Sequence, residues 1–168
     1  MNLYFMRHGI AADRADTGAK SRDRERTLTP KGIKRIRKEV KGLIAMSVSF
    51  DRILTSPLAR AGQTAKIVAK ALRLEDRLEE FPQLSPDQSV QDLMSGLIAY
   101  SGEKHILLVG HEPLLSSAVT FLLSGTAGAV IRIKKGGLCC LELDGIPPKK
   151  NALLHWALAP KQLRQLAR

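Results

Sequence analysis

The chain has 168 residues, a hydrophobic fraction of 44%, an aromatic fraction of 4% and a formal net charge of +11. This length predicts a single domain over residues 1–168, with a core built mainly from aliphatic side chains. Because the sequence has neither a secretory signal nor a run of about 18 apolar residues, we expect a cytoplasmic protein that makes no contact with a membrane.

Strands and helices alternate along the first part of the chain. The apolar run at 3–6 predicts a buried strand, and residues 10–28 are polar enough to form a long loop. Thr29-Pro30 and Ser56-Pro57 each combine an N-cap residue with a proline, which predicts a helix start at both places. Between these helices, residues 52–55 form a short strand.

The middle of the chain repeats this alternation. Ser85-Pro86 or Ser89 starts a third helix, and Pro113 starts a fourth. Between them, residues 106–109 are apolar without alternation, as expected of a central strand buried on both faces. The pattern predicts a three-layer α/β/α fold with a mostly parallel central sheet.

After Gly125 the sequence changes to a strand pattern. Lys135-Gly136-Gly137 has the composition of a tight turn, so we expect the first two of these strands to pair as a hairpin. The predicted elements are strands at 130–133, 138–143 and 153–158 and a short helix at 160–168.

Cations and imidazoles follow three of the predicted strands. Arg7 and His8 come directly after the first strand, Arg60 lies shortly after the second, and His111 follows the central one. Because the carboxyl ends of parallel strands share one sheet edge, we expect these side chains to converge. Guanidinium groups match phosphate oxygens, and a neutral imidazole can attack phosphorus. The sequence therefore predicts a phosphate site.

These residues resemble the motifs of a known family, the histidine phosphatase superfamily. The resemblance rests on Arg7-His8-Gly9, on the segment 56–65 and on Val109-Gly110-His111-Glu112-Pro113, in that order. Residues 28–32 also resemble a segment of its small bacterial members. The small size and the short interval between Arg60 and His111 are most similar to the SixA-type phosphohistidine phosphatases.

The resemblance implies a phosphoglycerate mutase-like fold and a reaction without metal or other cofactor. His8 is then the nucleophile that forms a phosphohistidine intermediate, which water hydrolyses. Arg7, Arg60 and His111 bind the phosphate oxygens, so a phosphate or sulfate ion is expected between them. The implied substrate is phosphohistidine on a phosphotransfer or signalling protein.

The identity of the general acid stays open. Glu112 is favoured, because one branch of the family carries an acid directly after the second histidine. Glu80 is the alternative, since mutase-like members take a Glu from this region, and Asp13 is a weaker candidate. Small members carry a Glu where this chain has Gln83. Phosphohistidine needs less acid assistance than an ester, because a protonated imidazole leaves readily.

Two other functions are compatible with the sequence. A phosphatase for small phosphate monoesters would use the same chemistry. A non-catalytic module that binds anions or nucleic acid would use only the positive charge, but no aromatic residues are interleaved with the basic ones, which argues against nucleic acid. The basic residues of the first loop could instead steer an acidic protein partner toward the site. They are Arg14, Lys20, Arg22, Arg24 and Arg26.

The two cysteines are expected to be structural and unpaired. Cys139 and Cys140 are adjacent, and neighbouring residues of a strand point to opposite faces. This arrangement argues against a disulfide and against a metal pair.

Overall fold

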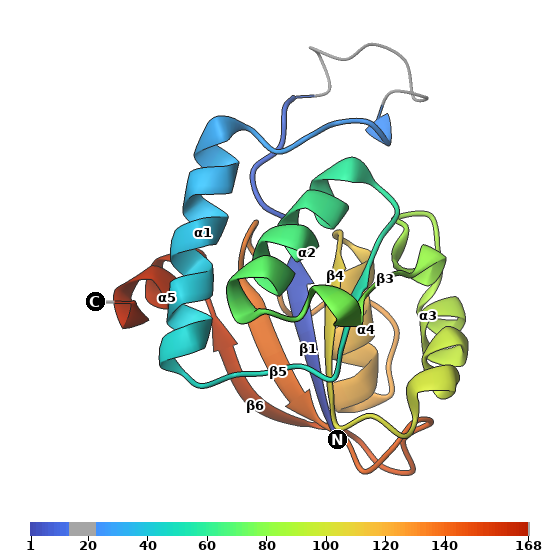
Figure 1. Ribbon diagram of the computed structural model, residues 1–168. Coiled ribbons are helices and arrows are strands. Elements are labelled where there is room, and N and C mark those ends of the chain that lie inside the picture. Colours follow the sequence, from blue (N-terminus) through green and yellow to red (C-terminus); the bar gives the residue numbers. More distant parts are fainter. Residues whose placement is uncertain (14–22, 168) are drawn as a thin grey trace.

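The computed structural model describes residues 1–13 and 23–167, which form a six-stranded sheet between two layers of helices (Figure 1). This is the predicted three-layer α/β/α class. The strands are β1 (Asn2–Arg7), β2 (Arg52–Thr55), β3 (Leu78–Glu80), β4 (His105–Gly110), β5 (Leu138–Glu142) and β6 (Leu153–Leu158). The α-helices are α1 (Pro30–Ala45), α2 (Ala59–Leu72), α3 (Val90–Leu97), α4 (Leu114–Ser124) and α5 (Pro160–Leu166). Short 3₁₀ helices are η2 (Glu75–Arg77), η3 (Pro82–Leu84) and η4 (Ile98–Tyr100).

The sheet has the strand order β3-β2-β4-β1-β5-β6. The first four of these strands are parallel, whereas β5 and β6 are antiparallel to their neighbours. The central strand β4 therefore lies between β1 and β2, and the carboxyl ends of all three open on the same edge. Ligands of open α/β sheets gather at such an edge.

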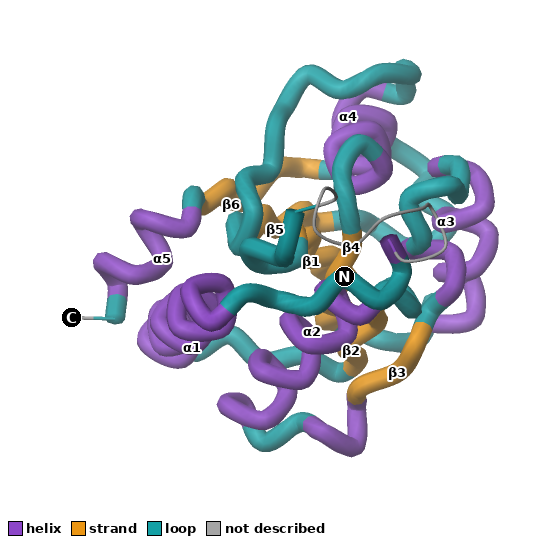
Figure 2. Tube along the Cα trace, turned by 90° about the horizontal axis from the view of Figure 1, so that it is seen from above, coloured by secondary structure: helices purple, strands orange, loops and turns teal. Residues whose placement is uncertain are grey.

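Helices cover both faces of the sheet (Figure 2). Helices α1, α2 and α5 lie on one face, and α3 and α4 lie on the other. Because successive strand side chains alternate between faces, Leu3 and Phe5 pack toward α3 and α4, while Tyr4 and Met6 pack toward α1 and α2. The longest helix, α1, has 16 residues. No helix within the described ranges is long and apolar enough to cross a bilayer.

The two cysteines follow the same alternation. Cys139 belongs to the core beneath α3 and α4, and Cys140 to the core beneath α1 and α2. Both thiols are buried and unpaired, as predicted.

Local capping explains where the helices begin. Thr29 caps α1, because its hydroxyl oxygen accepts a hydrogen bond from the backbone N–H of Gly32 at 3.0 Å. Of the two predicted starts of α3, Ser89 is the correct one, since it forms a reciprocal capping box with Asp92. The predicted start of α2 at Ser56-Pro57 is too early, because the helix begins at Ala59 and its N-cap residue is Leu58, without a side-chain cap. Ser56 precedes the helix, and its hydroxyl oxygen accepts a hydrogen bond from the N–H of Leu58 at 3.3 Å.

The predicted strand at 130–133 is wrong, and with it the hairpin around residues 135–137. Two backbone N–H groups of this segment donate to side chains and not to a partner strand. The N–H of Val130 donates to Thr120 Oγ1 at 3.0 Å, and the N–H of Ile133 donates to Glu112 Oε1 at 2.9 Å. Strand β5 pairs instead with β1 and β6.

Candidate active site

His8 and His111 meet at the carboxyl edge of the sheet. Strands β1 and β4 are adjacent and parallel, with Arg7 opposite Gly110. The backbone N–H of His8 donates to the carbonyl of Gly110 at 3.1 Å. The two imidazole rings lie 5.0 Å apart between centroids, and both side chains are buried. The strand pairing therefore produces the predicted convergence of the two histidines.

His8 is held in one tautomer. Its Nδ1 lies 2.7 Å from the carbonyl oxygen of Gly9. Since a carbonyl oxygen can only accept a hydrogen bond, Nδ1 carries the proton and Nε2 keeps its lone pair. Burial, reinforced by the charges of Arg60 and Arg7, lowers the pKa of His8 to about 3. The ring is therefore neutral near pH 7, as a nitrogen nucleophile must be.

Thr64 and Gly9 fix the backbone next to this imidazole. The N–H of Gly9 donates to Thr64 Oγ1 at 3.1 Å, and the Thr64 hydroxyl donates to the carbonyl of Arg60 at 2.7 Å. A side chain at position 9 would place its Cβ 2.8 Å from Ile36 Cγ1, so the close packing of α1 requires glycine there. The turn after β1 therefore packs against α1 at Ile36 and is hydrogen-bonded to α2 through Thr64.

His111 is a second neutral imidazole. Its Nε2 lies 2.9 Å from the hydroxyl oxygen of Ser56, which follows β2. Burial, with His8 and Arg60 nearby, lowers its pKa to about 3. Two buried polar atoms of this region, His111 Nδ1 and Arg7 Nε, have no hydrogen-bond partner among the described residues. Such nitrogen atoms beside cationic side chains suit an oxyanion.

Arg60 enters the site from the first turn of α2 and is held by Asp23. The Arg60 guanidinium donates to the backbone carbonyl of Asp23 at 2.7 Å and to its carboxylate at 3.1 Å. Asp23 also accepts from Arg26 at 2.7 Å. Burial acts to raise the pKa of Asp23, but Arg26 and Arg60 outweigh it and lower the pKa to about 2. Asp23 therefore stays ionised and orients Arg60.

The segment 23–28 is fastened to the start of α2. The N–H of Leu28 donates to Gln63 Oε1 at 2.7 Å, and the N–H of Ala59 donates to the carbonyl of Arg24 at 2.9 Å. Arg26, one of the residues expected to steer a partner, is instead tied to Asp23 and to a backbone carbonyl. Of the other predicted steering residues, Arg24 is exposed, whereas Arg14, Lys20 and Arg22 lie outside the described residues.

Arg7 is positioned through the segment that contains Ile133. Its guanidinium donates to the carbonyl of Ile133 at 3.1 Å, while the N–H of Ile133 donates to Glu112 at 2.9 Å. The other carboxylate oxygen of Glu112 accepts from the Ser116 hydroxyl at 2.5 Å. Burial lowers the pKa of Arg7, the Glu112 carboxylate opposes this shift, and Arg132 adds to it. Arg7, Glu112 and Arg132 line a cavity of about 420 Å³.

The candidate acids differ in position. Glu112 lies beside the site, but both of its oxygens accept hydrogen bonds from the protein. Glu80 is exposed on β3, at the far edge of the sheet from β1, with β2 and β4 between. Asp13 is exposed, and the side chain of Gln83 packs against Gly96 of α3. Of these four side chains, only Glu112 lines the cavity beside Arg7.

The remaining histidines lie outside the site. His105 is at the opposite end of β4, with its Nδ1 3.1 Å from the Tyr4 hydroxyl. His155 is exposed on β6 and pairs with Glu142 at 2.6 Å. Within the described part of the chain, no group of three or more His, Cys, Asp or Glu residues could hold a metal ion.

Three residues of the site were not predicted from the sequence: Asp23, Ser56 and Thr64. Ser56 and Thr64 lie in the segment 56–65 that carries the family resemblance, so this motif was an available signal for both. Asp23 lies in a loop without periodicity, and no local pattern distinguishes it.

The chain is similar to known proteins in sequence and in structure. The model of the histidine phosphatase superfamily (branch 1) matches residues 3–84. An uncharacterized protein of Picosynechococcus is 39% identical over 144 residues, which cover 84% of this chain and 85% of that protein. Phosphohistidine phosphatase SixA of Escherichia coli is 29% identical over 98% of this chain and 97% of its own. A solved structure of the protein histidine phosphatase SixA complexed with tungstate is 30% identical, with a TM-score of 0.83, and covers 97% of this chain and 99% of that one.

Proposed function

Since this chain belongs to the histidine phosphatase superfamily and is similar to phosphatases of that family, we propose that it hydrolyses phosphohistidine on phosphotransfer or signalling proteins. The observation that carries the proposal is the hydrogen bond from His8 Nδ1 to the Gly9 carbonyl. It leaves Nε2 as the attacking atom, within a cluster formed by the second imidazole and two guanidinium groups. The similarity to phosphohistidine phosphatase SixA supports the substrate class.

In the first step, His8 Nε2 attacks the phosphorus atom while the phosphorus–nitrogen bond of the substrate breaks. The electron pair of that bond stays on the departing imidazole, whose ring is neutralised by a proton taken up from solvent. Arg7, Arg60 and His111 stabilise the negative charge spread over the three phosphoryl oxygens. Tungstate is a tetrahedral oxyanion like phosphate, so its presence in the SixA complex supports the binding of a phosphate-like anion by this chain.

In the second step, a water molecule attacks the phosphorus atom of phospho-His8. The bond between phosphorus and Nε2 breaks, its electron pair returns to Nε2, and inorganic phosphate leaves. The same cations stabilise this transition state, because it carries the same charge distribution. The neutral His8 is restored for the next cycle.

The environment of Glu112 favours a substrate that needs little acid assistance. This carboxylate accepts hydrogen bonds from Ser116 and Ile133, so we assign it to positioning Arg7 through Ile133. An alkoxide leaving group requires a proton from a well-placed acid. An imidazole leaves once its ring is protonated, and for this reason we prefer phosphohistidine to a small phosphate monoester.

The proposal is tested by comparing kcat/KM for a phosphohistidine peptide with that for a panel of small phosphate monoesters. The phosphoenzyme is trapped in parallel. We expect preference for phosphohistidine and an acid-labile, alkali-stable label that His8→Ala abolishes. Turnover restricted to esters would establish the monoesterase instead. No turnover of either substrate would establish a non-catalytic anion-binding module.

A further inference from the structure

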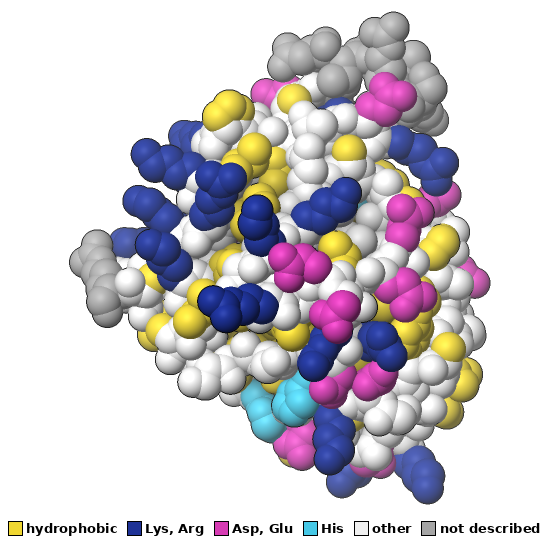
Figure 3. Space-filling model, in the orientation of Figure 1, with side chains coloured by type: hydrophobic (Ala, Val, Ile, Leu, Met, Phe, Trp, Pro, Cys, Tyr) yellow, Lys and Arg dark blue, Asp and Glu magenta, His cyan; other side chains and the backbone are white. Residues whose placement is uncertain are grey.

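A group of exposed cations lies on α1 and α2, the two helices that begin next to the candidate active site. Figure 3 shows Lys and Arg side chains gathered over α1 at the upper left of the molecule. Two hollows occur here, one of about 660 Å³ along α1 and one of about 400 Å³ between α1 and α2, and both include Arg37. We name their cations the α1–α2 basic surface: Lys34, Arg37, Lys38, Lys41, Lys66 and Lys70.

The charges of this surface are not neutralised by its own helices. Neither hollow is lined by an acidic residue. The only acid of α1, Glu39, is buried and pairs with Arg164 of α5 at 2.5 Å, and α2 contains no acid. Like charges on neighbouring helices repel one another, and such a field attracts an anionic macromolecule.

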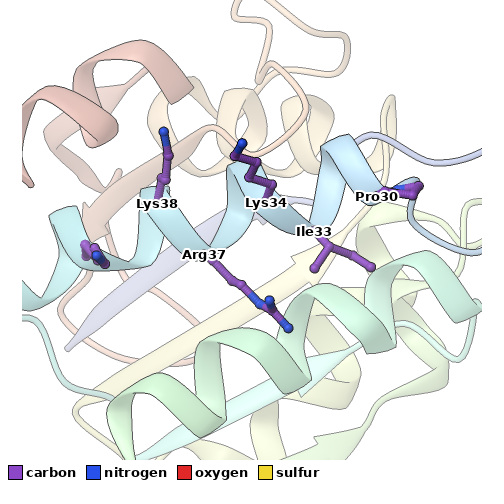
Figure 4. A pocket seen from close by; sticks show the side chains of 6 residues that line it. Pro30, Ile33, Lys34, Arg37 and Lys38 are labelled. Carbon is purple, nitrogen blue, oxygen red and sulfur yellow. The ribbon is translucent and has the colours of Figure 1, made fainter.

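The hollows have apolar linings between the cations. Figure 4 shows Ile33 and Arg37 extending from α1 toward α2, with Lys34 and Lys38 on the other side of the helix. Pro30 and Ile33 contribute apolar surface to the first hollow, and Ile67 and Ala71 to the second. No aromatic residue lines either hollow, so nothing here can stack on bases. Apolar contact surface ringed by cations complements an acidic protein segment with aliphatic side chains.

The two helices that carry this surface begin next to the active site. The N–H of Thr29, which caps α1, donates to the carbonyl of Ile10 at 2.9 Å, two residues after His8. Helix α2 places Arg60 in the site, and Lys66 and Lys70 follow about 9 and 15 Å further along the helix axis. A typical interface covers about 800 Å² on each partner. A protein domain that presents phosphohistidine to His8 is therefore large enough to reach these helices.

We propose that the α1–α2 basic surface docks an acidic, amphipathic segment of the phosphohistidine-bearing protein substrate. This inference rests on the proposed function, since it names the partner class for the same site. The surface provides affinity and selects among phosphoproteins, while the chemistry remains with the buried histidines and arginines.

Direct binding tests the proposal without any catalytic step. The probe is a fluorescent synthetic helical peptide with Asp and Glu on one face and Leu on the other, without phosphohistidine. Its affinity is measured by fluorescence anisotropy with the full chain, with the variant K34E/R37E/K38E and with the control K104E/K149E/K150E. The control makes the same change in net charge at exposed lysines outside both hollows.

We expect the K34E/R37E/K38E variant to bind this peptide at least about tenfold more weakly than the wild type, and the control to differ by less than about threefold. Equal loss in both variants, or no loss in either, would overturn the proposal. So would tighter binding of a DNA duplex or of phosphatidylserine vesicles through the same three residues, since each identifies another partner class.

A kinetic measurement separates this inference from the proposed function. The same variants are assayed with free phosphohistidine and with a phosphohistidine peptide that carries the acidic amphipathic segment. We expect K34E/R37E/K38E to lower kcat/KM about tenfold for the peptide only. If wild-type protein hydrolyses neither substrate, the proposed function fails while the anisotropy result still decides the docking. Equal kcat/KM of this variant and the wild type for the acidic peptide would exclude docking during catalysis.

Discussion

The carboxyl edge of the sheet and the α1–α2 basic surface both present cationic side chains, but those at the sheet edge are held by hydrogen bonds and those on the helices are exposed. At the sheet edge, Arg60 is 5% exposed and is held by Asp23, and Arg7 is held by the carbonyl of Ile133. On the helices, Arg37 and its neighbours are exposed and belong to no ion pair within the described residues. Buried and oriented charge acts on one set of oxygen atoms, whereas exposed charge acts at long range and is screened by salt.

The largest expected effect on catalysis is at His8, the proposed nucleophile of the buried site. We expect His8→Ala to lower kcat by at least about 10⁴-fold, because it removes the imidazole to which we assign the covalent bond with phosphorus. Steady-state turnover and phosphoenzyme trapping measure the effect. His155→Ala serves as the matched control, since this histidine is exposed and pairs only with Glu142. A label that persists in His8→Ala would show that another residue is the nucleophile.

Arg60 tests whether orientation matters beyond charge. We expect Arg60→Lys to lower kcat by about 10²-fold although it keeps the positive charge, because an ammonium group cannot replace the guanidinium geometry. Asp23→Asn is expected to cost about tenfold, since it weakens the contact that orients Arg60. Single-turnover kinetics measure the rate of phosphoryl transfer in the wild type and in both variants. Wild-type kcat in Arg60→Lys would mean that this site works by charge alone, like the helix surface.

Glu112 distinguishes positioning from proton donation. We expect Glu112→Gln to keep kcat within about fivefold for phosphohistidine, because the amide oxygen can still accept from Ile133. Glu112→Ala is expected to lower kcat about tenfold, because Ile133 and Ser116 lose their hydrogen-bond acceptor. For the same reason it is expected to lower the free energy of unfolding by about 1–3 kcal/mol. Kinetics and urea denaturation measure the pair. Loss of the basic limb of the pH profile in Glu112→Gln would identify Glu112 as the acid.

Burial of the imidazoles predicts how stability depends on pH. Burial lowers the pKa of His8 and of His111 to about 3, below the ordinary value of 6.5. Between these values the unfolded chain binds protons that the folded protein does not, so the free energy of unfolding decreases as the pH falls below about 6.5. The slope is at most about 1.4 kcal/mol per pH unit for each histidine.

Urea titrations at several pH values measure this slope, and His8→Asn is expected to reduce it by the share of one histidine. An equal slope in the wild type and in His8→Asn would show that His8 titrates normally in the folded protein.

Salt produces the smallest expected effect at the buried site. Raising ionic strength from about 0.05 to about 0.5 M shortens the screening length to a few ångströms. We expect kcat for free phosphohistidine to change by less than about twofold, while binding of the acidic peptide weakens markedly. A parallel decrease of both quantities would remove the distinction between the two regions.

Much of the fold could be predicted because its signals are local. The apolar run of β4, the capping residue Thr29 and the positions of His8 and His111 at strand ends are all visible in short windows of sequence. The strand expected at 130–133 had the same kind of local signal. It does not form, and the N–H groups of Val130 and Ile133 donate instead to the side chains of Thr120 and Glu112, 10 and 21 positions away.

By itself, the sequence determined the five α-helices, five of the six strands and the residues that follow β1, β2 and β4, because these depend on the spacing of apolar side chains and on capping. The short strand β3 was not predicted. Only the tertiary structure decided how the site is assembled. Arg60 meets Asp23 across 37 positions, and Arg7 meets Ile133 across 126. Such hydrogen bonds depend on how distant segments pack, and no periodicity in the chain encodes them.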